Sequence, residues 1–222
     1  MKLKGLALLA LMALHVASLG ATPSSPSELA AAVQKKYDGI RDFSADFVHT
    51  YRGGVLRKQL SEKGRVLVRR PGRFRWEYTA PEEKLFVSDG LKVYSYVPLD
   101  KQVVVTTVPP DDGASTPALF LAGKGNLTRD FTASAGEVPP GAPVDTVALK
   151  LVPRTPQPDY DSLVVLVDRA TLTLRGLVTS DAQGGTSSLS FLNLKENVGL
   201  ADKDFAFKMP RGVDVVTDSG RR

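Results

Sequence analysis

Residues 66–78 read Val-Leu-Val-Arg-Arg-Pro-Gly-Arg-Phe-Arg-Trp-Glu-Tyr, and the order of residue types in this stretch decides the fold. Aromatic side chains occupy every second position after the Pro-Gly pair, at Phe74, Trp76 and Tyr78. Because successive side chains of a β-strand point to opposite faces, this alternation predicts a strand with one aromatic face and one charged face. Val66 and Val68 have the same spacing before the Pro-Gly pair, and they predict a second strand with an apolar face.

Short runs of the same kind recur along the chain. The runs that we predict as strands are 43–47, 63–70, 73–79, 84–88, 92–97, 102–108, 127–133, 146–152, 160–167, 172–179, 186–194 and 205–208. Ten to twelve short strands at close spacing are typical of a mainly β chain that forms one antiparallel sheet or barrel.

Two segments depart from the strand pattern. Residues 24–40 carry apolar side chains three or four positions apart, at Leu29, Val33, Tyr37 and Ile40. This spacing predicts an amphipathic helix, for which Ser27 is the expected N-cap. Residues 116–123 read Thr-Pro-Ala-Leu-Phe-Leu-Ala-Gly and combine a capping threonine, a proline at the first helical position and a closing glycine. They predict a short, apolar second helix.

The N-terminus has the pattern of a secretory signal peptide. Lys2 and Lys4 precede an apolar run over residues 5–14, and small residues follow as far as Ala21. The run is too short to span a bilayer, which needs about 20 residues. We therefore expect a signal peptide at 1–21 and one exported domain at 22–222, located in the periplasm.

Composition excludes several kinds of chemistry. The chain has no cysteine and two histidines, of which only His49 lies outside the predicted signal. Disulfide scaffolds, thiolate metal sites and histidine clusters are therefore excluded, and no known catalytic or phosphate-binding motif occurs. Loss of the signal peptide would lower the formal net charge from +5 to +3. So small an excess of positive charge does not favour nucleic acid as the partner of the arginines that lie among the aromatic residues. We predict no enzyme, cofactor, metal or nucleic-acid partner.

Arg70 differs from the other arginines of the opening stretch. It shares even numbering with the apolar residues on both sides, so it faces the apolar side if Pro71-Gly72 preserves the register. A charge in such a place needs several acceptors. The second predicted helix offers backbone carbonyls at its end, at Leu121 and Ala122. We therefore predict that Arg70 holds this helix over the open side of the sheet.

Several motifs together resemble one known family. They are Arg70-Pro71-Gly72-Arg73-Phe74-Arg75-Trp76, Pro81-Glu82-Glu83-Lys84-Leu85-Phe86-Val87-Ser88-Asp89-Gly90, Phe43-Ser44-Ala45-Asp46-Phe47, the helix after Thr116-Pro117, and Phe205-Ala206-Phe207-Lys208-Met209-Pro210-Arg211-Gly212-Val213. In this order they resemble the periplasmic outer-membrane lipoprotein carrier family, LolA, over almost all of the predicted mature chain.

The resemblance implies a single unclosed antiparallel β-barrel, here of about eleven strands, with a short helical lid over a hydrophobic cavity. The lid matches residues 118–122, and the family's lid-holding arginine matches Arg70, with Leu121 and Ala122 at the lid's end. The residues that we expect around the cavity are Phe47, Val66, Val68, Phe74, Trp76, Tyr78, Leu119 and Phe120.

The resemblance also implies a function and partners. Such a chaperone binds the acyl chains of lipoproteins released by an inner-membrane ABC-type complex and passes them to an outer-membrane receptor, and we expect it to be a monomer. The receptor itself is a poor match, because it needs an N-terminal lipid-bearing cysteine and the chain has no cysteine. A related exported lipid-binding or lipid-sensing half-barrel, or an exported enzyme using carboxylate chemistry, are the remaining alternatives.

Overall fold

In the computed structural model, the part of the chain that can be described is residues 25–53, 59–108, 116–157, 160–180 and 184–218. The predicted signal peptide lies outside these residues. The strands are β1 Asp42–Arg52, β2 Gln59–Arg69, β3 Arg73–Ala80, β4 Lys84–Asp89, β5 Lys92–Val97, β6 Gln102–Thr107, β7 Phe131–Ala135, β8 Thr146–Pro153, β9 Ser162–Asp168, β10 Leu174–Ser180, β11 Thr186–Glu196 and β12 Asp214–Asp218.

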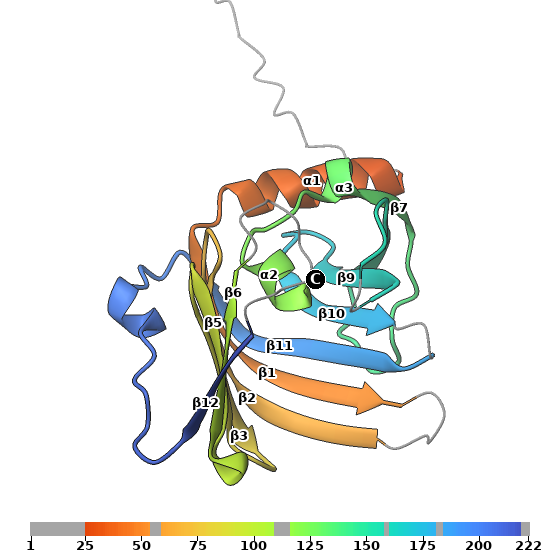
Figure 1. The fold of residues 1–222 in the computed structure, drawn as a ribbon. Coiled ribbons are helices and arrows are strands. Elements are labelled where there is room, and N and C mark those ends of the chain that lie inside the picture. The colour runs from red at the N-terminus through yellow and green to blue at the C-terminus, as the bar shows by residue number, and fades with distance from the viewer. Residues whose placement is uncertain (1–24, 54–58, 109–115, 158–159, 181–183, 219–222) are drawn as a thin grey trace, which may run out of the picture.

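Within these described ranges, twelve strands form one sheet in the order β12-β6-β5-β4-β3-β2-β1-β11-β10-β9-β8-β7. β12 and β7 lie at opposite ends of this order, so the sheet is not closed. It bends strongly around the helix α2 (Pro117–Leu121), while α1 (Pro26–Asp38) and α3 (Leu127–Asp130) lie across one end of the bend (Figure 1). The prediction of a mainly β, unclosed barrel with short helices is confirmed.

One hydrophobic core joins the helices to the sheet. Ala30 and Val33 of α1 and Leu119 and Leu121 of α2 belong to the same buried cluster as the apolar strand residues. We call the face of the sheet that packs against these helices the inner face. Within the described ranges, every helix falls short of the length and apolar character needed to cross a membrane.

The first helix begins two residues earlier than its predicted cap implies. Ser25, and not Ser27, is the N-cap, because Pro26 occupies the first helical position where no N–H is needed. The Glu28 N–H donates to the Ser25 hydroxyl at 3.2 Å, and the Ser25 N–H donates to the Glu28 carboxylate at 3.2 Å. This reciprocal capping box fixes the start of α1.

The strand predicted at 127–133 is wrong over its first half. Asn126 accepts hydrogen bonds from the N–H groups of Thr128 and Arg129, at 3.0 and 2.9 Å, and so caps the short helix α3 before β7 begins. The strand predicted at 205–208 is also wrong: Phe205 is the last residue of a 3₁₀ helix, η2 (Asp202–Phe205), and residues 206–208 belong to no helix or strand. Phe205 is 1% exposed there, with the Arg69 guanidinium 5.7 Å from its ring centroid.

The last strand was not predicted, and its direction departs from the antiparallel rule. β12 pairs with β6 in parallel, with Val215 opposite Val103. Between β11 and β12 the chain crosses the outer face, where Phe207 stacks on Tyr94 with ring centroids 4.8 Å apart. A crossing of this length lets a strand return in the same direction as its neighbour, which a tight hairpin does not allow. The twelfth strand also covers the edge that β6 would otherwise expose. A further short helix, η1 (Pro98–Asp100), links β5 to β6.

Candidate functional site

The helix α2 places apolar side chains against the inner face. Thr116 caps it by accepting the Leu119 N–H at 3.2 Å, as the sequence predicts. Leu119 and Leu121 are 4% and 2% exposed, and the Phe120 ring meets the Phe131 ring edge-on with centroids 5.9 Å apart. Because burying a leucine side chain contributes about 1.5–3 kcal/mol, these two leucines alone favour a docked α2.

The end of α2 is tied to the turn between β2 and β3. The Ala122 carbonyl accepts a hydrogen bond from the Gly72 N–H at 2.9 Å. The carbonyl of the same glycine accepts one from the Ser88 hydroxyl at 2.6 Å, and Ser88 is completely buried. The turn is therefore held by the sheet on one side and holds the end of α2 on the other.

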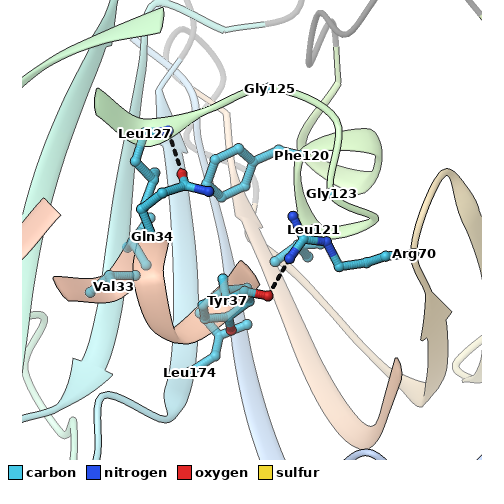
Figure 2. Close-up of a pocket in the computed structure, with 11 residues that line it drawn as sticks. Val33, Gln34, Tyr37, Arg70, Phe120, Leu121, Gly123, Gly125, Leu127 and Leu174 are labelled. Atoms are coloured by element: carbon cyan, nitrogen blue, oxygen red, sulfur yellow. Dashed lines mark hydrogen bonds between the residues drawn. The ribbon is translucent and has the colours of Figure 1, made fainter. Parts of the chain in front are cut away.

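Arg70 lies beside the end of α2 but donates its hydrogen bond to a different helix. Its guanidinium donates to the backbone carbonyl of Tyr37 in the last turn of α1 (Figure 2). It also lies 3.9 Å from the Asp38 carboxylate. The sequence predicted carbonyls of Leu121 and Ala122 as acceptors. The Ala122 carbonyl already accepts the Gly72 N–H, whereas the end of α1 offers a carbonyl and the negative end of a helix dipole.

Gly123 makes this approach possible. Its φ is +83°, and a Cβ at this position would lie 2.1 Å from Arg70 Nε. Arg70 therefore runs directly along the backbone that follows α2, between that backbone and the end of α1. We call α2 together with Ala122 and Gly123 the lid; Arg70 lies against the lid at Gly123 and is hydrogen-bonded to α1.

The space between α1 and the lid is small. A cavity of about 30 Å³ lies there, lined by Val33, Gln34, Tyr37, Arg70, Phe120, Leu121, Gly123, Gly125, Leu127, Val165 and Leu174 (Figure 2). A cavity needs roughly 10–15 Å³ of such space to hold one water molecule, so this one has room for a few waters and none for an acyl chain. Among the described residues, the protein's own side chains thus fill most of the space between α1, the lid and the inner face, and the lid leucines belong to this packing.

The predicted cavity residues come together on that inner face. Six of them belong to the buried core cluster and two pack against it; the six are Phe47, Val66, Val68, Phe74, Trp76 and Leu119, and the two are Tyr78 and Phe120. The Phe47 ring meets the Trp76 and Tyr78 rings edge-on, with centroids 4.9 and 4.8 Å apart. Trp76 also lies 6.2 Å from Phe191, and Tyr78 lies 5.7 Å from Phe86. We call these five aromatic residues the aromatic cluster.

Beyond the aromatic cluster lies a row of polar side chains that the sequence analysis missed. The Glu62 carboxylate is 2.5 Å from Lys84 Nζ and 3.0 Å from His49 Nδ1, and His49 Nε2 is 2.7 Å from the Ser187 hydroxyl. Glu62 is only 4% exposed. We call these four residues the polar row. Burial, reinforced by the nearby Glu62 carboxylate, raises the pKa of Tyr78 well above its ordinary value, so its phenol stays neutral.

Strand alternation in the sequence already indicates where two residues of the polar row lie. His49 continues the odd positions of Phe43 and Phe47, and Glu62 continues the even positions of Val66 and Val68. Strand alternation alone therefore puts these polar side chains on the inner face. The pair itself was not predictable, because nothing local in the sequence shows that β1 and β2 place His49 opposite Glu62.

The fold and the site together define a class of protein: a curved, unclosed β-sheet whose apolar inner face is covered by a short helix. The family described as "Outer membrane lipoprotein carrier protein LolA" matches residues 38–208. The chain belongs to this family, and the resemblance found in the sequence is confirmed.

Several relatives support the assignment over most of the chain. The outer-membrane lipoprotein carrier protein of Methylococcus capsulatus is 33% identical, covering 82% of this chain and 84% of the relative. That of Bordetella avium is 31% identical, covering 97% and 96%. An uncharacterized conserved protein from Thermus thermophilus has a similar solved structure, with a TM-score of 0.51, 17% identity and coverage of 86% and 98%. This last likeness concerns the fold alone.

Proposed function

We propose that this chain is a periplasmic chaperone that carries lipoproteins as a monomer. It receives them from an inner-membrane ABC-type releasing complex and hands them to an outer-membrane receptor. The acyl chains of the cargo enter between the lid and the inner face. Membership of the LolA family supports the carrier role, and the names of its relatives support lipoproteins as cargo.

One observation carries the proposal: the lid covers the apolar inner face but is held there by few polar contacts. Ala122 is bonded to Gly72, and Arg70 joins the end of α1 beside Gly123. Among the described residues, the other contacts of the lid are apolar and include those of Leu119, Phe120 and Leu121. An acyl chain offers the inner face the same kind of contact that these leucines make, so it can replace them.

The energetics favour exchange between apolar environments. Moving an acyl chain out of water gains about 0.8 kcal/mol per methylene, so three long chains would exceed the practical limit of roughly 20 kcal/mol for non-covalent binding. The binding free energy of the cargo is therefore not set by transfer of its acyl chains from water. The cargo passes from bilayer to carrier to receptor, and the net differences are small. A charge-assisted hydrogen bond of about 1.5–3 kcal/mol, such as that of Arg70, is then enough to bias loading against release.

The test is transfer by an Arg70→Leu variant. Because the Arg70 contact favours the closed, empty lid, its loss is expected to stabilise the loaded form: the variant should bind lipoprotein and pass less of it to the receptor. Arg65→Leu is the matched control, since Arg65 is exposed. Mass spectrometry of wild-type protein isolated from the periplasm identifies the cargo. Unchanged transfer by Arg70→Leu removes the role of this arginine, and absence of any bound lipoprotein removes the carrier function.

A further inference from the structure

The indole of Trp76 has a feature that the packing of the core does not explain. Trp76 is 4% exposed, and no acceptor among the described residues lies within hydrogen-bonding distance of its buried Nε1. Buried polar groups in folded proteins are nearly always paired, and an unpaired one calls for an explanation. A phenylalanine would fill an apolar site without this unpaired donor.

The surroundings of the indole are apolar. Its nearest aromatic neighbours are Phe47 and Phe191, with ring centroids 4.9 and 6.2 Å away, and its partners across the sheet are Val66 and Phe86. The strands on both sides use their own backbone carbonyls in the sheet. An acceptor for this N–H therefore has to arrive with a ligand that enters the inner face.

The chemistry of the pocket wall restricts that ligand. A buried water needs two to four polar partners, and the indole offers one donor among hydrocarbon rings. A phosphate or carboxylate would be buried without a counter-charge, at a large desolvation penalty. A neutral carbonyl flanked by hydrocarbon meets both conditions: a single donor is enough to satisfy its oxygen, and it brings no charge into the apolar site.

We infer that Trp76 is the hydrogen-bond donor for the carbonyl that links a fatty acyl chain to the rest of the cargo. The inference rests on the proposed function and deepens it by assigning a binding residue for the linkage. The indole lies between the lid and the polar row along the inner face. The hydrocarbon tail then extends under the lid, and the polar remainder of the cargo lies towards Lys84, His49 and Glu62.

A pair of matched probes tests this assignment. One is a synthetic diacyl lipopeptide with ester linkages, and the other is the dialkyl lipopeptide in which ether linkages replace the ester carbonyls. Trp76 is the only tryptophan of the chain, so a ¹H–¹⁵N spectrum of the full chain contains a single indole N–H signal. We expect the ester probe to move this signal downfield, as a new hydrogen bond does, and the ether probe to move it much less.

Affinity gives an independent measurement through a two-by-two comparison. Wild type is expected to bind the ester probe roughly 3- to 10-fold more tightly than the ether probe, the range of one net hydrogen bond. In Trp76→Phe the ratio should fall to about one. Because both probes bind the same variant, any general loss of packing cancels in the ratio.

The outcomes separate this inference from the carrier proposal. If both probes bind wild type with equal affinity and move the indole signal equally, the carbonyl assignment is wrong while lipid binding stands. If neither probe binds wild type, the carrier proposal fails first. If Trp76→Phe does not fold, the wild-type spectra with the two probes still decide the question.

Discussion

Replacing Gly123 by alanine is expected to open the lid, because this glycine is where Arg70 crosses the backbone. A Cβ would lie 2.1 Å from Arg70 Nε and 2.9 Å from Cζ, whereas ordinary contact begins at 3.4 Å. The guanidinium therefore has to move by more than 1 Å. Such a movement takes it away from the Tyr37 carbonyl, its acceptor at the end of α1.

The size of the effect follows from that hydrogen bond. A hydrogen bond from a charged group contributes about 1.5–3 kcal/mol, and the lid of the variant can close only if Arg70 gives up this bond, so the open fraction of the lid should rise roughly 10- to 150-fold. The ion pair with Asp38 adds little, because that carboxylate is 60% exposed and 3.9 Å away. A second contribution is the φ of +83° at Gly123, which costs an alanine about 1–2 kcal/mol.

Gly141→Ala separates these two contributions. Gly141 has a φ of +81°, and no atom lies within 4 Å of the position of an added Cβ. This control therefore carries the backbone strain without the collision. Amide hydrogen exchange of residues 117–124, read by mass spectrometry on the intact protein, measures lid opening directly. We expect fast exchange there in Gly123→Ala and wild-type exchange in Gly141→Ala.

A double variant completes the comparison. In an Arg70→Ala background the collision no longer exists, so adding Gly123→Ala should cost only the backbone strain that Gly141→Ala shows. Wild-type exchange of the lid in Gly123→Ala, or an equally large effect in the presence and absence of Arg70, would refute the reasoning.

Three further substitutions test other parts of the structure. Gly64→Ala should destabilise the fold by about 2–4 kcal/mol, because its Cβ would lie 2.0 Å from a backbone oxygen of β3. Lys84→Met should destabilise it by roughly 3–5 kcal/mol, because it removes a cation from the buried Glu62 carboxylate. Asp168→Asn should lower stability at pH 7, because hydrogen bonds, led by that from the Thr171 N–H, hold the pKa of the Asp168 carboxyl well below its ordinary value of 3.8. Wild type loses this stabilisation as the pH falls below 3.8, so the difference in stability between the variant and wild type should shrink there.

Urea unfolding followed by the single tryptophan measures all three changes. Wild-type stability in Gly64→Ala would mean that β2 and β3 adjust to a side chain at this position. A Lys84→Met protein as stable as wild type would mean that Glu62 is adequately satisfied by His49 alone. A deficit in Asp168→Asn that stays constant between pH 7 and pH 3 would contradict the assigned low pKa.

Local patterns made most of the strands and both predicted helices accessible from the sequence. The alternation of Phe74, Trp76 and Tyr78 fixes a strand and its inner face, because the period of two allows no other structure. The lid was predictable because Thr116, Pro117 and Gly123 each favour one position of a short helix. These signals depend on neighbours within one turn, so no tertiary information is needed.

The features that were missed depend on contacts far apart in the chain. The acceptor of Arg70 belongs to α1, 33 residues earlier, and nothing in the sequence near Arg70 shows where that helix ends in space. β12 is short and becomes a strand only because β6 offers it an unpaired edge. Likewise, Phe205 is of a residue type common in strands, but it ends a 3₁₀ helix in which its ring is buried beside Arg69, far away in the sequence.

The small volume under the lid bears on how a carrier of this kind could work. An open apolar cavity would expose hydrocarbon to water whenever the carrier was empty, whereas the closed lid buries Leu119 and Leu121 against the inner face. Loading then exchanges one apolar contact for another, and the balance depends on contacts that break when the lid moves. Two such contacts are the Gly72–Ala122 hydrogen bond and the packing of Arg70 against Gly123, at the two sides of one turn. A partner that displaces this turn would change both contacts at once, so the proposed function predicts that the β2–β3 turn is where loading and release are controlled.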